Sequence, residues 1–106
     1  MTFFAAVKVP VDEIKVKHYE GLPHDPNRVL LPRPHLVLLK QTPEGIFLYR
    51  YTASGIEVGD TWHQTLDEAH GQADYEYGEL TWKKVPEGIV SEVDYALSQI
   101  GAEGDT

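Results

Sequence analysis

Residues 46–78, IFLYRYTASGIEVGDTWHQTLDEAHGQADYEYG, change from a strand pattern to a helix pattern within one short stretch. Aromatic and β-branched residues are frequent in residues 46–52 and return in residues 56–64, which is typical of strands. The Ala-Ser-Gly sequence at residues 53–55 predicts a tight turn between them. Apolar residues recur at helical spacing after Thr65. The stretch therefore predicts a strand–turn–strand–helix unit.

The helix in this unit has two possible starting positions. If Asp60 is the N-cap, one side of the helix carries a polar stripe of possible metal ligands: His63, Asp67, His70 and Asp74. If Thr65 is the N-cap, Glu68 completes a capping box. The side facing the protein is then apolar, with Leu66, Ala69, Ala73 and Tyr77. We favour Thr65, because the capping box and the apolar side agree on it, and we expect Gly78 to end the helix.

The rest of the chain predicts further strands and a second helix. Residues 3–9 form a short apolar run that predicts a strand, and residues 80–85 predict another strand; each ends at a proline. Residues 35–41 are apolar enough for a central strand. Ser91 is the expected N-cap of a short helix ending at Gly101. We predict a single α+β domain in the order β-loop-βββαβα. It has an antiparallel sheet of about four to five strands, one main helix and a short C-terminal helix, with the helices on one face.

Residues 18–35 are rich in proline, which removes backbone donors and favours extended geometry, so we expect an ordered loop. A long loop in a small domain is often functional. Together with the strand at residues 56–64 it supplies a candidate polar site: His18, His24, His35 and His63. The alternative is a loop that only straps one face of the sheet. Residues 102–106 are expected to fray.

The composition allows one domain, residues 1–106, and excludes several kinds of chemistry. Apolar residues make up 42% and charged residues 25%, which are ordinary values for a globular protein. There is no cysteine, so disulfides, thiol catalysis and Cys-bound metals are excluded. The spacings HExxH, GxGxxG, GxxxxGK[ST] and GxSxG are also absent. We therefore expect a non-enzymatic protein without metal or cofactor. The alternative is a small hydrolase or metal-dependent enzyme that uses the four histidines of the candidate polar site.

The N-terminal residues show no secretory signal pattern, and no apolar run approaches the roughly 20 residues of a membrane span. A cytoplasmic location is therefore expected.

Charge is distributed unevenly along the chain. Residues 1–50 carry seven Lys/Arg and five Asp/Glu, a net charge of +2, whereas residues 51–106 carry two and twelve, a net charge of −10. Such a surface repels nucleic acid and anionic lipid and attracts a basic protein. The candidate partner-binding residues lie on the predicted main helix: Asp67, Glu68, Asp74, Glu76 and Tyr75. The alternative is that these acids serve only solubility. A homodimer through an edge strand is a further possibility.

Residues 35–79 contain a Gly-Asp-Thr step at residues 59–61, followed by Asp-Glu-Ala at residues 67–69. In this they resemble the N-terminal domain of HicB-type antitoxins. The resemblance implies a βββα unit that binds a small basic toxin or another protein. The chain departs from the family in lacking its Pro-Asp-x-Pro-Gly loop and a DNA-binding tail. Residues 59–78 are also similar to small uncharacterised bacterial proteins, a resemblance that implies no function.

Overall fold

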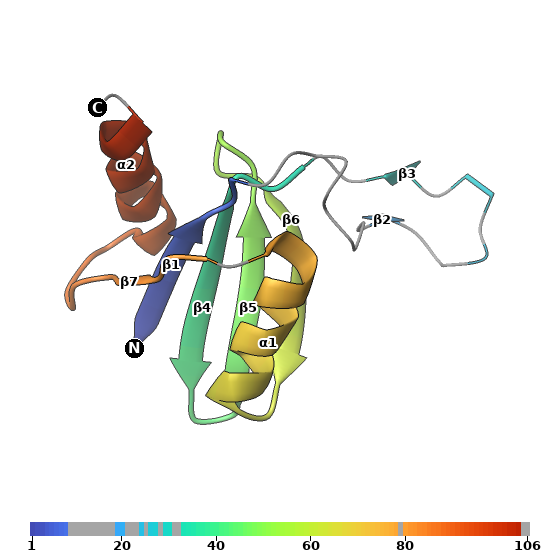
Figure 1. Cartoon of the computed structure of the whole chain (residues 1–106), viewed down its shortest axis with the longest axis horizontal. Helices are drawn as coiled ribbons and strands as arrows, with labels where there is room; N and C mark the ends of the chain where they lie inside the picture. The colour runs from blue at the N-terminus through green and yellow to red at the C-terminus, as the bar shows by residue number, and fades with distance from the viewer. Residues whose placement is uncertain are drawn as a thin grey trace.

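The computed structural model describes residues 1–8, 19, 20, 24, 26, 27, 29, 30, 33–78 and 80–104. Its main sheet has five strands in the order β6-β5-β4-β1-β7, and all neighbours are antiparallel. These strands are β1 (Thr2–Ala6), β4 (Leu36–Thr42), β5 (Gly45–Tyr51), β6 (Glu57–His63) and β7 (Lys83–Lys84), as Figure 1 shows. The helices are α1 (Leu66–Tyr77) and α2 (Glu92–Gly104). The predicted α+β class with an antiparallel sheet is confirmed.

The region predicted as one ordered loop, residues 18–35, contains a short antiparallel pair of strands. β2 (Tyr19–Glu20) pairs with β3 (Val29–Leu30), and Figure 1 draws this pair apart from the main sheet. Most of the other residues of the region lie outside the described part of the chain. The alternative, a loop that straps one face of the sheet, depends largely on those residues and so lies outside the described part of the chain.

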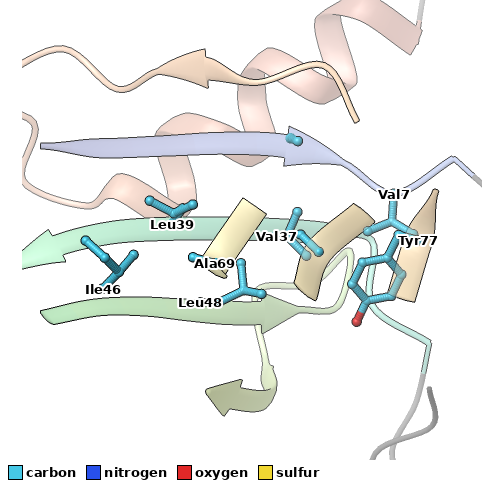
Figure 2. Packing of buried hydrophobic residues seen from close by; sticks show 9 residues of the cluster. Val7, Val37, Leu39, Ile46, Leu48, Ala69 and Tyr77 are labelled. Carbon is cyan, nitrogen blue, oxygen red and sulfur yellow. The ribbon is translucent and has the colours of Figure 1, made fainter. Parts of the chain in front are cut away.

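The two helices lie on opposite faces of the sheet, so the expectation that both cover one face is wrong. On one face, α1 contributes Ala69, Ala73 and Tyr77 to a core that also contains Ala5, Val7, Val37, Leu39, Ile46 and Leu48 (Figure 2). On the other face, α2 contributes Ala96 and Ile100 to a core with Phe4, Leu36 and Val85. The physical reason lies in β4, where four consecutive apolar residues, Leu36 to Leu39, are all buried. A strand that is apolar on both faces needs cover on both.

The start of α1 agrees with the Thr65 N-cap. The Glu68 backbone N–H donates to the Thr65 hydroxyl at 3.2 Å, and the Glu68 carboxylate accepts from the Gln64 backbone N–H at 2.9 Å. Asp60, the alternative cap, lies within β6. Gly78 ends the helix at a positive φ of 77°, which a glycine adopts without steric cost. The capping signals were therefore sufficient to place this helix.

The second helix begins as expected and ends later. The Asp94 backbone N–H donates to the Ser91 hydroxyl at 3.2 Å, as an N-cap requires. The helix continues through Gly101 to Gly104, so the prediction that Gly101 ends it is wrong. A glycine inside a helix costs only about 1 kcal/mol relative to alanine, which a helix packed on a sheet tolerates.

Leu48 tests the core between α1 and the sheet. It is fully buried at the centre of β5, so Leu48→Ala should lower the free energy of unfolding by about 2–5 kcal/mol through lost burial and a cavity. Urea denaturation measures this loss. Val90→Ala, at a fully exposed position, is the control and should leave the free energy of unfolding unchanged within error. Equal losses in the two variants would contradict this assignment of the core.

Candidate functional site

Four of the five predicted partner-binding residues lie at the exposed surface of α1. Asp67, Glu68 and Asp74 are exposed, and the side chain of Tyr75 is 57% exposed. Asp67 and Asp74 are seven residues apart and therefore lie on the same side of the helix. We refer to Asp67, Glu68, Asp74 and Tyr75 as the acidic face of α1.

Glu76 is not part of this face, and its assignment to the partner-binding surface is corrected. Its side chain is fully buried. The reason is helical spacing: Glu76 lies three residues after Ala73 and seven after Ala69, and both alanines are buried against the sheet. The helix therefore directs this one carboxylate inward.

Glu76 forms a buried ion pair with Arg50 of β5. Arg50 Nε donates to Glu76 Oε1 at 2.9 Å, and Nη2 donates to Oε2 at 2.5 Å, so the guanidinium binds the carboxylate with two hydrogen bonds. Both side chains are fully buried. Burying an ion pair costs several kcal/mol per ion in lost hydration, and two-point geometry with further hydrogen bonds offsets that cost.

Further hydrogen bonds surround the ion pair. Arg50 Nη1 donates to the Leu48 carbonyl at 3.1 Å, and Nη2 donates to the Thr61 hydroxyl at 3.2 Å. Gln72 Nε2 donates to Glu76 Oε2 at 2.7 Å. Thr61 in turn lies 2.8 Å from Nε2 of His63 on β6. The network therefore joins β5, β6 and α1 and ends at a half-buried histidine.

Two titratable groups respond to this network. Burial, and after it the Glu76 carboxylate, raises the pKa of Tyr77, so its phenol stays neutral. The Tyr77 hydroxyl is buried and finds no hydrogen-bonding partner of good geometry among the described residues. Burial and the nearby Arg50 charge lower the pKa of His63, against an opposing effect from Glu68 and Glu76. Nε2 of a neutral His63 can accept a hydrogen bond from the Thr61 hydroxyl. The Thr61 oxygen is then free to accept a hydrogen bond from Arg50.

The four histidines of the candidate polar site are not gathered by the fold, as far as it is described. His63 pairs with Ile46 at one end of β5, whereas the backbone of His35 bonds to Tyr51 at the other end. His24 is exposed, and His18 lies outside the described residues. Among the residues the structure describes, no group of three or more His, Cys, Asp or Glu could hold a metal ion. The histidine-based enzyme interpretation therefore gains no support from the geometry.

Neither of the two described helices has both the length and the apolar character that crossing a membrane requires. Comparison with protein-family models, curated proteins and solved structures gives no match to this chain. The antitoxin resemblance of residues 35–79 therefore stays a prediction.

The Arg50–Glu76 pair is the feature that the sequence interpretation did not identify. Two signals for it were present. Alternation along β5 placed Arg50 on the same face as Ile46 and Leu48, and helical spacing placed Glu76 with the small apolar residues of α1. A cation and an anion at two inward positions on neighbouring elements indicate a buried pair.

Removing the charge of Glu76 tests the network. Glu76→Gln keeps the shape of the side chain but leaves the Arg50 charge buried without its counter-ion, so the free energy of unfolding should fall by about 3 kcal/mol or more. Chemical denaturation measures it, with the exposed Asp74→Asn on the same helix as control. A loss no larger than that of the control would show that the pair is unimportant for stability.

His63 predicts a pH dependence of stability. Because its pKa is lowered in the folded state, the unfolded chain binds the proton first as the pH falls through about 6.5, the ordinary histidine value. Stability should therefore decrease as the pH falls below this value, until the folded state is protonated as well. His63→Gln should remove this part of the decrease in denaturation curves measured from pH 8 to pH 5, whereas His35→Gln should retain it. If the stability of wild type and of His63→Gln falls equally between pH 8 and pH 5, the decrease does not come from His63.

Proposed function

We propose that this chain is a small non-enzymatic protein-binding module that holds a basic partner on the acidic face of α1. One observation supports this most directly. Among the residues that the structure describes, Glu76 is the one carboxylate of α1 paired with a cation in the core, while Asp67, Glu68 and Asp74 are exposed. Residues 51–82, which include β6 and α1, contain no Lys or Arg, so this part of the chain supplies no cation of its own.

The surface has the properties of a protein-recognition site. Tyr75 adds an exposed aromatic ring beside the carboxylates, and tyrosine is a frequent anchor of protein interfaces. The carboxylates attract a cationic partner and speed its association. Because the ion pair and the core fix the orientation of α1, little ordering is needed on binding. The resemblance to HicB-type antitoxins supports the same class of partner, a small basic protein, in a cytoplasmic setting.

Charge reversal tests the proposal. Wild-type protein and the Asp67→Lys, Asp74→Lys double variant are immobilised, and proteins captured from cell lysate are compared by quantitative mass spectrometry. We expect a basic protein that is captured by the wild type and depleted at least about tenfold by the variant, because two attractions become two repulsions. Capture should weaken as salt is raised.

The matched control is Glu87→Lys, Asp94→Lys, which changes the net charge equally at exposed positions outside α1. It should retain the captured protein. If the α1 variant is folded, as judged by circular dichroism, and retains every protein that the wild type captures, the acidic face serves only solubility.

A further inference from the structure

β6 is an edge strand with one side available for pairing. It is seven residues long, it pairs with β5, and it stands at one end of the strand order of the main sheet. No other described strand pairs with it. An edge of this kind presents unpaired backbone donors and acceptors, to which an extended peptide can add as a further strand.

An ordered aromatic surface lies beside this edge, on the sheet face away from α1. Trp62 of β6 is 54% exposed, yet its ring is fixed: Nε1 donates to the Glu44 carbonyl at 2.9 Å. The ring also packs where a Cβ of Gly45 would lie, at 2.2 Å from Nε1, and Gly45 has a positive φ of 136°. Next to Trp62, the rings of Phe47 and Tyr49 stack with centroids 5.9 Å apart. A fixed, half-exposed indole loses little side-chain entropy on binding.

The charges along β6 are all negative. Glu57 and Asp60 are exposed and pair across the ladder with Tyr51 and Tyr49. They therefore share the face that carries Trp62, because direct cross-strand partners lie on the same side of a sheet. Lys40 of β4 lies opposite Phe47 on this face, and its charge is paired with Glu92 at 3.3 Å. Lysine or arginine side chains placed over these rings would gain both cation–π and ionic contacts.

The other side of the same edge is bordered by α1. Glu68 accepts from the backbone of Gln64, one residue after β6, and so lies at the end of the strand. Tyr75 follows Glu68 by seven residues and shares its side of the helix. The acidic face of α1 thus begins at the end of β6, and the helix packs beside this strand (Figure 1).

We propose that β6 binds an extended basic segment of the partner as an additional strand, with Lys or Arg at every second residue over Trp62 and Asp60. This rests on the proposed function and adds the mode of binding. A second copy of this chain fits less well, because its β6 would add two more carboxylates to the same ladder. The occupant is therefore a cationic strand from another protein.

The probe is a synthetic peptide of the length of β6 that alternates lysine with valine. Titrated into ¹⁵N-labelled protein, it should shift the amide resonances of β6 and the Trp62 indole, and it should slow hydrogen exchange along β6. Two N-methylated versions, each lacking the backbone donors of one edge, separate strand addition from simple charge attraction. Blocking the edge that faces β6 should abolish binding, and blocking the other edge should not.

Substitutions identify the surface. Glu57→Lys, Asp60→Lys should weaken peptide binding roughly tenfold, because two opposite-charge pairs become like-charge pairs. Trp62→Ala should weaken it as well, and Glu87→Lys, Asp94→Lys should not. Each variant is first checked for an amide spectrum like that of the wild type. If Trp62→Ala unfolds, the double variant Glu57→Lys, Asp60→Lys alone tests the surface.

Four results would overturn the proposal: shifts confined to α1, equal binding of both N-methylated peptides, no saturable binding to the wild type, or a dimer through β6 in sedimentation. These outcomes are independent of the capture experiment. Asp67→Lys, Asp74→Lys should still show the β6 shifts, so failure of the α1 proposal and failure of strand addition give different results.

Discussion

The buried ion pair between Arg50 and Glu76 is the constraint on which the arrangement of α1 depends. Two opposite charges without access to water are stable only while they face each other. Arg50 is fixed in β5, so α1 has to present Glu76 toward the sheet. Once that rotation is fixed, helical geometry directs Asp67 and Asp74 outward. The same pair that joins helix and sheet thereby orients the acidic surface.

The ion pair accounts for only one of the twelve carboxylates in residues 51–106, so this half of the chain stays strongly acidic. Arg50 comes from the less acidic first half of the chain, and its charge is used inside the core. The outward carboxylates of α1 and β6 have no basic residue within their own elements. Protein surfaces commonly intersperse lysines among their carboxylates, whereas β6 and α1 contain none. This imbalance is the reason for proposing a cationic partner.

Local features of the fold could be predicted from the sequence, and features that depend on distant pairing could not. The Thr65 cap and the strands around the turn at residues 53–55 follow from short-range patterns, and the structure has both. The position of β1 between β4 and β7 depends on pairing between segments far apart in the chain, about which short-range patterns are silent. The placement of α2 on the second face covers the apolar residues that β4 presents there.

For the candidate site too, local features were predictable and contacts between distant segments were not. Exposure of Asp67 and Asp74 followed from helical spacing, whereas Glu76 was misplaced because the residue type was given more weight than its position. A charged residue among alanines at inward spacing requires a buried partner, and Arg50 was the available one. The histidines illustrate the same error. His35 and His63 were grouped by residue type, although the strand register separates them by the length of β5.

A double-mutant cycle across Arg50 and Glu76 measures the coupling between sheet and helix most directly. The free energies of unfolding of Arg50→Met, Glu76→Leu and the double variant are compared with that of the wild type in urea at pH 7. If the pair orients α1, the double variant is more stable than the sum of the single losses predicts, with a coupling energy of about 2–3 kcal/mol. Additive losses, with a coupling energy near zero, would contradict the role assigned to the ion pair.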